Sequence, residues 1–540
     1  MNTVLYSARR IHTMDPARPS ATHVAVRDGR IVGVGTLDEL AALGPHDLDE
    51  RFADAVLLPG FVEGHTHSDT GNVWQLCYCG SFDRIGPDGR RWRGLARATD
   101  VLDRLRSADR PGERLVFGWG FDPLFVDRGF TREDLDRVSR DKPVVVMHAS
   151  GHIANVNTAA LRVVGLLDSK AAHDGLPRGP DGLPTGELRG VEVLLPAAHA
   201  LDIVGLLSGT DEAGAWRFAQ LAARVGLTTV TDLGNLLDEE RTSALLAATA
   251  HDDFPVRIVA ARMAMDGSPQ ESITQVRQLQ GRSTERLRFG SLKIVIDGSI
   301  QGFSARLRAP GYHNGAPNGL WYMAPEQVRG LYEAALRTGF QVHAHTNGDE
   351  ASELALDCLE VALARCPRAN HRFTLQHAQL LDRTQLERMR RLGMGANFFA
   401  NHLYYWGDVH AAQTVGPARA ARMNPCATAL ELGVPFSIHS DEPVTPMAPL
   451  FTAWCAVQRE SATGQVLGEA ERISVAAALH AITLGSAYLL RLDREIGSIE
   501  VGKRADFAVL QDDPLEVEPR RLKDVPVLGT VLGGRWFARA

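Results

Sequence analysis

Residues Leu57–His67 read LLPGFVEGHTH, an apolar run that ends in two histidines separated by one residue. The run has the character of a β-strand, in which side chains at positions i and i+2 point the same way. His65 and His67 can therefore converge on one point beyond the strand end, as two ligands of a metal ion would. The chain has 19 histidines, and residues 343–345 repeat the spacing. The pair alone is equally compatible with two histidines that cap a strand through ordinary hydrogen bonds.

The composition is that of an ordinary globular protein. The chain has 540 residues, of which 44% are hydrophobic and 23% charged, so it can bury a large core. Its net charge of −7 and isoelectric point near 6.3 argue against a nucleic-acid or anionic-membrane partner. We interpret the arginine-rich stretch Arg84–Arg97 as a solvated loop.

The cysteines and the N-terminus bear on the compartment. Six cysteines over so long a chain are too few for a disulfide scaffold. The first residues lack the apolar core of a signal peptide, and no stretch approaches the ~18 apolar residues of a membrane span. We expect a cytoplasmic protein with a small-molecule substrate and no membrane or nucleic-acid partner, and a homodimer remains open.

Both ends of the chain show the pattern of short strands separated by turn residues. The pattern covers residues 24–27, 31–34, 505–510, 527–532 and 535–537. Asp28-Gly29, between the first two runs, is a strong β-hairpin signal. We expect the two ends, residues 1–56 and 485–540, to form one composite β-sandwich domain.

The middle of the chain alternates short apolar strands with helical patterns, such as those at 351–365 and 383–391. Strands are expected at 143–147, 227–232, 256–261, 292–296, 340–345, 373–377, 393–398 and 435–439. This alternation favours a parallel sheet, and eight such units close as a (β/α)8 barrel with its active site at the carboxyl ends of the strands. The expected fold class is α/β, with the barrel over residues 57–484.

Candidate ligands lie at or near the ends of these strands, at Lys293, His345, His377 and Asp441. His345 and His377 are 32 residues apart, which is about one βα unit. His377 and Asp441 are 64 apart, about two units, so these side chains fall on strands 5, 6 and 8. Histidines and aspartates placed at random would rarely show this regular spacing of about 32 residues.

The distance from the first histidine pair to Lys293 indicates an insertion. His67 and Lys293 are 226 residues apart, far more than three βα units need. We expect much of this span, about residues 77–208, to be an inserted lid over the barrel mouth that shapes the substrate pocket.

Six motifs together resemble the amidohydrolase superfamily, specifically its YtcJ-like branch (amidohydrolase family 3), which includes N-substituted formamide deformylases. The motifs are Pro59–His67, Lys293–Ser299, His345–Asp349, Gln376–Gln379, His439–Val444 and Ile496–Asp506. They span nearly the whole chain. The resemblance implies a (β/α)8 barrel beside a small β-sandwich made from both chain ends, with one or two divalent metal ions, most often zinc.

The resemblance also implies a ligand set, carried over residue by residue. His65, His67 and Asp441 would bind the more buried ion, and His345 and His377 would bind the second ion. The spacing to Gly348-Asp349 that is typical of the family favours His345 over His343 as the ligand. We interpret His439, two residues before Asp441, as barrel packing, with contact to the site as the alternative.

Lys293 would be N6-carboxylated by carbon dioxide and bridge the two ions. A lysine in an apolar strand has a desolvated charge, so its pKa falls readily. The neutral amine can then add carbon dioxide to give a carbamate anion that binds metal. The alternative is a buried lysine paired with a carboxylate such as Asp297.

The expected reaction is hydrolysis of a non-peptide C–N bond in an N-substituted amide, a formamide or a cyclic amide. A metal-activated hydroxide would attack the carbon, and Asp441 would act as general base and then general acid. The alternatives are C–C hydrolysis or decarboxylation at the same site, and a catalytically silent relative with a binding or regulatory role.

Aromatic residues are frequent in the segments expected at the barrel mouth and favour a flat or aryl-bearing substrate. Packing of the inserted lid is the competing interpretation. The candidate substrate contacts are His152, Trp119, Arg306, His402 and Trp321.

Overall fold

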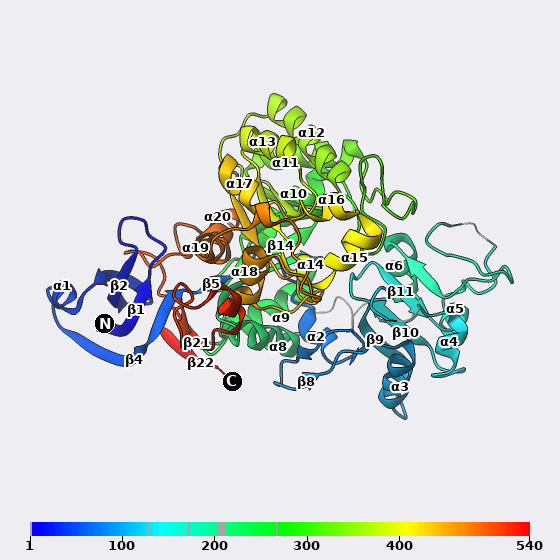
Figure 1. Ribbon diagram of the computed structural model, residues 1–540, viewed down its shortest axis with the longest axis horizontal. Coiled ribbons are helices and arrows are strands. Elements are labelled where there is room, and N and C mark those ends of the chain that lie inside the picture. The colour runs from blue at the N-terminus through cyan, green and yellow to red at the C-terminus, as the bar shows by residue number, and fades with distance from the viewer. Residues whose placement is uncertain (1–2, 127–128, 171–172, 204–210, 266, 540) are drawn as a thin grey trace. The chain divides into compact units, whose positions relative to one another are not determined.

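Eight parallel strands form the centre of the fold in the computed structural model, which describes residues 3–126, 129–170, 173–203, 211–265 and 267–539 (Figure 1). Their order is β19-β18-β17-β16-β15-β14-β13-β5, and each neighbouring pair is parallel. The strands are β5 (Phe61–Val62), β13 (Leu227–Asn235), β14 (Arg257–Met263), β15 (Leu287–Val295), β16 (Gln341–Thr346), β17 (Thr374–His377), β18 (Gly395–Phe398) and β19 (Phe436–Ile438). The predicted α/β barrel class is confirmed.

Two loops join the first and last strands of this sheet. Thr66 and Glu442 form a parallel bridge just beyond β5 and β19. The N–H of His67 donates to the carbonyl oxygen of Glu442 at 3.2 Å, and the N–H of Asp441 donates to that of His65 at 3.1 Å. The sheet therefore closes into a barrel at the carboxyl ends of its strands, within two of the sequence motifs.

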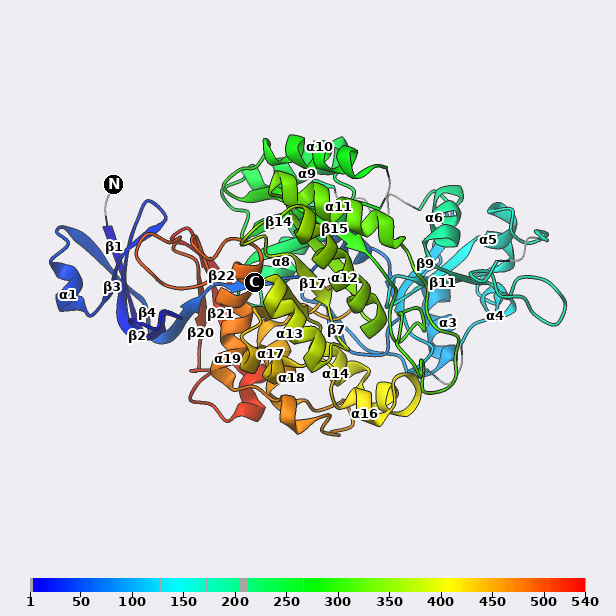
Figure 2. The same cartoon turned by 90° about the horizontal axis from the view of Figure 1, so that it is seen from above.

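Helices follow barrel strands β14 to β18 and lie along the outside of the barrel (Figure 2). They are α10 (Pro269–Gln280), α11 (Pro325–Thr338), α12 (Asp349–Arg365), α13 (Arg383–Leu392) and α17 (Cys426–Leu432). In α13 a capping box of Asp382 and Gln385 starts the helix, and left-handed Gly393 ends it. Within the described ranges, no helix is long and apolar enough to cross a membrane.

One expected strand belongs to a different sheet. The alternation alone groups residues 143–147 with the barrel strands, but β10 (Val144–His148) lies in a separate five-stranded sheet, and the first barrel strand is β5. A short apolar run predicts a buried strand without specifying the sheet in which it pairs.

That five-stranded sheet belongs to a second compact unit, formed by residues 68–218 and 239–245. Its strand order is β12-β11-β10-β9-β6, with β9 and β10 parallel and β10, β11 and β12 antiparallel. The other strands are β6 (Cys77–Tyr78), β9 (Val116–Phe121), β11 (Ile153–Val156) and β12 (Glu187–Arg189). The expected insertion at residues 77–208 falls inside this unit, and the rest of the chain forms the first unit.

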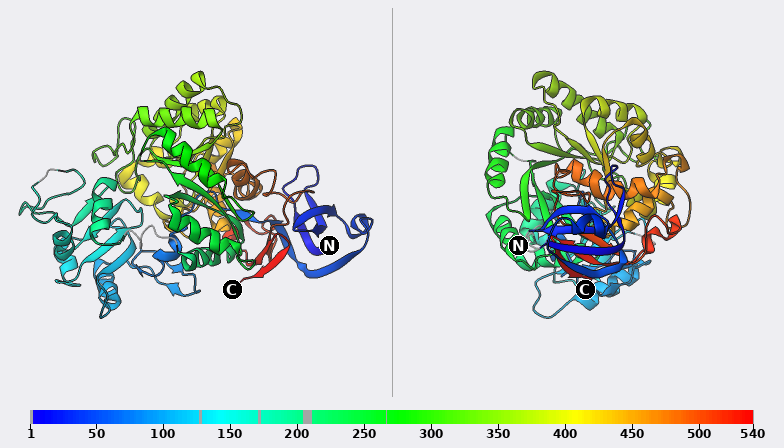
Figure 3. Two further views of the ribbon diagram at one scale, coloured as in Figure 1. Left: turned by 180° about the vertical axis from the view of Figure 1, so that it is seen from behind. Right: turned by 90° about the vertical axis from the view of Figure 1, so that its left-hand side faces the viewer.

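Both chain ends contribute strands to one seven-stranded sheet in the first unit, blue and red in Figure 3. Its order is β22-β21-β20-β4-β1-β2-β3, with β1 (Thr3–His12), β2 (Ser20–Arg27), β3 (Arg30–Gly35), β4 (His46–Pro59), β20 (Phe507–Leu510), β21 (Val527–Leu532) and β22 (Arg535–Ala538). The expected hairpin turn is present, with Asp28 and Gly29 both in the left-handed region that a type I′ turn requires. Phe52 of β4 packs against Trp536 of β22 with ring centroids 5.0 Å apart. Side chains from both ends therefore share one core.

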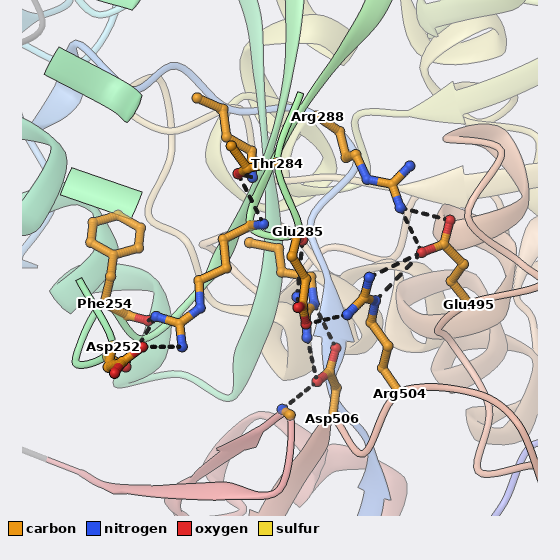
Figure 4. A network of polar contacts seen from close by, with 12 residues as sticks. Asp252, Phe254, Thr284, Glu285, Arg288, Glu495, Arg504 and Asp506 are labelled. Atoms are coloured by element: carbon orange, nitrogen blue, oxygen red, sulfur yellow. Dashed lines mark hydrogen bonds and ion pairs between the residues drawn. The ribbon is translucent and has the colours of Figure 1, made fainter. Parts of the chain in front are cut away.

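A network of charged side chains joins the amino ends of the barrel strands to the C-terminal segment (Figure 4). Arg257, at the start of β14, donates from Nε to Asp506 at 3.1 Å, and both side chains are almost fully buried. Arg288 of β15 pairs with Glu495 at 2.7 Å, and Arg504 contacts Glu495 at 3.4 Å. These contacts hold residues 495–506 against the amino ends of the barrel strands, opposite the candidate ligands.

Candidate metal centre

The six predicted ligands lie at the carboxyl ends of barrel strands. His65 and His67 follow β5 and Asp441 follows β19, while the other three lie on β15, β16 and β17. All are buried except His67, whose side chain is 29% exposed. Parallel strands bring their carboxyl ends to one edge, which explains how residues up to 376 positions apart in sequence meet there.

His65, His67 and Asp441 form one group suited to a metal ion. Each offers one ligand atom, and these atoms lie within 4.8 Å of one another. Oδ1 of Asp441 is 3.2 Å from Nε2 of His67 and 3.5 Å from Nε2 of His65. This oxygen is buried and accepts no hydrogen bond from the described residues. A buried charge needs compensation, and a cation among these atoms would provide it.

The ring nitrogens of His377 are a second sign that a metal ion belongs at this site. Both of its ring nitrogens are buried without a hydrogen-bond partner among the residues that the structure describes. Its ring centroid lies 4.6 Å from that of His65 and 4.3 Å from that of His345. Burial lowers the pKa of His377 well below its usual value, so the ring is neutral and its lone pair is available. The donor set therefore fits a divalent ion that takes nitrogen and oxygen ligands.

Backbone strain occurs at the same two ligands. His377 has φ of 68° and Asp441 has φ of 58°, in the left-handed region that side chains other than glycine rarely adopt. Such residues cost about 1–3 kcal/mol each and are concentrated at functional sites. Both strained residues here are predicted metal ligands.

Hydrogen bonds with residues that are not predicted ligands orient the His65 ring. Its Nδ1–H donates to Oε1 of Gln376 at 2.8 Å, which leaves Nε2 for a metal ion. The same oxygen accepts a bond from Asn397 at 2.8 Å, and Nε2 of Gln376 donates to His343 at 2.9 Å. A Cβ at Gly64 would lie 2.9 Å from the Asn397 amide nitrogen, so glycine at this position leaves room for the Asn397 side chain.

Lys293 is buried beside the first group. Its Nζ lies 3.3 Å from Nε2 of His65. Burial lowers the pKa of Lys293 to about 7, although the charge of Asp441 opposes the shift. The amine is therefore partly neutral near neutral pH.

Asp297 is not the partner of this lysine. Its two oxygens accept hydrogen bonds from the main-chain N–H groups of Asn347, Gly348 and Arg306 at 2.8–3.0 Å. Burial nevertheless raises the pKa of Asp297 to about 7. The alternative of a Lys293–Asp297 ion pair is thus absent from the described contacts, and Asp297 instead organises the loops after β15 and β16.

The two histidines of β16 both face the barrel interior but have different neighbours. His343 lies deeper and bonds to Gln376, and burial lowers its pKa to about 3. His345 packs against His377, and its Nε2 lies 3.2 Å from the carbonyl oxygen of Gly298. A ligand role for His345 stays a prediction.

Glu63 is a buried residue of the site that the sequence argument missed. Its carboxylate accepts from the Ser440 N–H at 3.2 Å and from the Ser440 hydroxyl at 2.8 Å. Burial raises the pKa of Glu63 to about 8. Glu63 precedes His65 by two residues, so strand periodicity could have placed it on the ligand side. It joins the two loops that supply His65 and Asp441.

His402, a predicted substrate contact, is buried in α14 (Asn401–Tyr405). Its Nδ1 lies 3.0 Å from Nε2 of His410, whose Nδ1 bonds Thr414 at 2.8 Å. Its ring stacks on Trp406 with centroids 4.4 Å apart and also contacts Phe399 at 4.4 Å.

Arg306 and Trp321, two further candidates, lie together. The Arg306 guanidinium is 4.7 Å from the centre of the Trp321 ring, and that tryptophan is 41% exposed. The guanidinium also pairs with Glu350 at 3.0 Å and donates to the carbonyl oxygen of Gly319 at 3.0 Å. A substrate anion would have to share the guanidinium with Glu350.

Trp119 and His152 belong to the second unit. Trp119 is buried against Trp74 and Tyr78, with ring centroids 5.1 and 4.9 Å away. Arg84 lies 5.3 Å from the Trp119 ring, a cation–π contact, so this arginine of the expected solvated loop is in fact buried. His152 is half-buried just before β11.

A closed (β/α)8 barrel that gathers buried histidines, a lysine and an aspartate at the carboxyl ends of its strands defines a class of metal-dependent barrel proteins. A sequence profile described as the amidohydrolase family matches residues 53–538. The chain belongs to this family.

Two curated relatives and one solved structure show the extent of the similarity. The chain is 26% identical to the putative amidohydrolase YtcJ of Bacillus subtilis, over 97% of each chain. It is also 26% identical to the N-substituted formamide deformylase of Arthrobacter pascens, over 99% of this chain and 98% of that one. A crystal structure of an uncharacterised metal-dependent hydrolase from Pyrococcus horikoshii has a TM-score of 0.73 at 21% identity, with 96% and 99% of the two chains covered, and thus shares the fold.

Proposed function

We propose that this chain is a metal-dependent hydrolase that cleaves a non-peptide C–N bond in an N-substituted amide, a formamide or a cyclic amide. The observation that carries the metal dependence is the set of buried atoms without hydrogen-bond partners, on His377 and Asp441, beside His65. The choice of bond draws on the similarity to the formamide deformylase, which extends over nearly the full length of both chains.

His65, His67 and Asp441 would hold one divalent ion, with zinc the best match to nitrogen and carboxylate donors. His345 and His377 would serve a second ion when two are bound. When bound, such an ion lowers the pKa of a water molecule and polarises a carbonyl group.

Asp441 is the residue best placed to move a proton. Burial alone would raise its pKa, but the nearby imidazole of His67, together with His439 and Lys293, lowers it. The carboxylate is therefore ionised at neutral pH and can take a proton from the attacking water. It then returns that proton to the leaving nitrogen, which departs as a neutral amine.

Lys293 would carry the carbamate, as N6-carboxylysine. The support is its burial next to His65 without a carboxylate bonded to its Nζ among the described contacts. Metal-loaded protein prepared with ¹³C-bicarbonate should show a carbamate carbon signal by NMR that is absent from Lys293→Met. A wild-type spectrum without that signal would remove the carbamate from the proposal.

We propose Arg306, Trp321 and His402 of the first unit as substrate contacts; His152 and Trp119 belong to the second unit and stay predictions. The Arg306–Trp321 pair combines an aromatic surface with a cation, which suits an aryl-bearing amide.

The test of the function is a substrate panel. Full-length protein stripped of metal and reloaded with zinc or manganese plus bicarbonate is assayed on N-substituted formamides, other N-substituted amides and cyclic amides. We expect release of amine, or of the ring-opened product, only from the metal-loaded protein. Release of carbon dioxide without amine would point to a decarboxylase and contradict the proposed bond.

A further inference from the structure

His439 is a second buried histidine whose ring nitrogens have no hydrogen-bond partner among the described residues. It follows β19 directly and is fully buried. A buried polar group left without a partner costs about 1–3 kcal/mol, so packing alone does not account for an imidazole at this position.

Two aromatic rings fix the orientation of His439. It stacks on His65 with centroids 4.9 Å apart and ring planes 23° apart, and on Phe399 at 4.6 Å and 30°. Its contact with His377 is tilted, at 5.0 Å and 60°. The contacts with His65 and Phe399 are close to parallel, and the two ring nitrogens have no hydrogen-bond partner among the residues that the structure describes.

One of these nitrogens contributes to a second ligand group. His65, His377 and His439 each offer one nitrogen, and these atoms lie within 4.8 Å of one another, the same limit that His65, His67 and Asp441 satisfy. Ligand atoms around a tetrahedral zinc ion are about 3.3 Å apart, given Zn–N distances of about 2.0–2.1 Å. Inward movements of at most about 1.5 Å would bring the atoms to that spacing.

His65 belongs to both groups and can use only one nitrogen for a metal ion. Its Nδ1 is bonded to Gln376, so Nε2 is the ligand atom in each group. One imidazole nitrogen has one lone pair and binds one ion at a time. If His439 and His65 bind one ion, that ion is therefore the one that His67 and Asp441 also bind.

We propose that His439 is a direct ligand of the ion that His65 binds, alongside His67 and Asp441. This inference rests on the metal centre of the proposed function and adds a ligand to the set implied by the sequence motifs. Four protein donors leave a position for water, because zinc can expand from four to five ligands.

The test is a cobalt titration of the full-length protein after removal of metal. Wild type is compared with His439→Phe, which keeps the stacked ring but removes both nitrogens. The matched control is His402→Phe, because His402 is equally buried, also contacts Phe399, and belongs to neither ligand group. The readouts are the cobalt dissociation constant and the visible spectrum of the bound cobalt, which reports its ligands directly.

We expect His439→Phe to weaken cobalt binding by about 100-fold or more, since loss of even an outer-shell partner costs about 10–100-fold. Its cobalt spectrum should change, while His402→Phe keeps the wild-type spectrum. Identical spectra for wild type and His439→Phe would overturn the inference, whatever the affinity, and leave the proposed function standing. Wild type that binds no cobalt would overturn both.

Crystals of the zinc-loaded wild type decide the matter if His439→Phe does not fold. Anomalous density should place the ion about 2.0–2.1 Å from a His439 nitrogen. An ion bound by His65 but beyond about 3 Å from both nitrogens of His439 would overturn the inference.

Discussion

The main-chain N–H of Asp441 donates a hydrogen bond to the carbonyl oxygen of His65 at 3.1 Å. With the bond from His67 to Glu442, it closes the barrel between its first and last strands. The side chains of the same segments form the group suited to a metal ion. The segments that close the barrel therefore also carry the ligands of the proposed centre. Metal binding should for this reason stabilise the fold.

Replacing Asp441 with asparagine should separate catalysis from folding. The amide of the Asp441→Asn variant cannot accept a proton, and loss of general acid–base catalysis costs about 10²–10⁴-fold in turnover. The main-chain bond to His65 does not involve the side chain, so the melting temperature of the metal-free protein should change little. Product release and thermal unfolding measure the two effects. Turnover within a few-fold of wild type would assign the proton transfer to another residue.

Gln376→Met should lower metal affinity, although Gln376 is not itself a predicted ligand. It removes the acceptor that holds Nδ1 of His65, and the loss of such partners typically costs about 10–100-fold in affinity. The control is Gln341→Met, because Gln341 is also buried but bonds main-chain carbonyls of Arg372 and Leu489 at the far end of β16. Zinc dissociation constants distinguish the two variants. Equal affinities in both would show that Gln376 does not orient the ligand.

Glu63→Gln should change how the stability of the metal-free protein depends on pH. Burial raises the pKa of Glu63 to about 8 in the folded chain, above an unfolded value of about 4.3. The favourable contribution is therefore complete below the unfolded pKa and is lost as the pH rises through the folded pKa. Glutamine resembles the protonated acid and can still bond to Ser440.

Urea unfolding at about pH 5, 7 and 9 tests this dependence. The stability of Glu63→Gln relative to wild type should increase from the lowest pH to the highest. A difference that is the same at all three values would mean that Glu63 does not titrate in this range.

Asp506→Asn should destabilise the fold at a distance from the centre. It removes the buried carboxylate partner of Arg257 and leaves the exposed Glu285 at 3.5 Å, and breaking a buried pair costs about 3–5 kcal/mol. Glu516→Gln is the control, since the Arg10–Glu516 pair is exposed and worth at most about 1 kcal/mol. The free energy of unfolding in urea measures both. Similar losses in the two variants would show that the network in Figure 4 does not anchor the C-terminal segment.

The sequence predicted those parts of the molecule that local patterns encode. The hairpin at Asp28-Gly29 was predictable because its turn needs two left-handed residues. The barrel strands that carry His345 and His377 were predictable because each is a short apolar run ending in a histidine, one βα unit apart.

The remaining features depend on pairings between distant residues. The bond between Glu63 and Ser440 spans 377 positions, and no local pattern indicates it. Strand Val144–His148 has the same apolar character as the barrel strands, so only tertiary pairing shows that it belongs to another sheet. Arg84 lies in a polar stretch, and its burial follows from aromatic rings such as Trp119 that pack around it.

The most direct test of the central claim is a zinc titration of the metal-free full-length protein, with metal content and melting temperature as readouts. Wild type should retain at least one zinc ion per chain and be stabilised by about 4 kcal/mol when free zinc is 1,000 times the dissociation constant. The double variant His65→Phe/His67→Phe should show neither effect. Wild type that retains no zinc and shows no rise in melting temperature would contradict a metal centre at His65, His67 and Asp441.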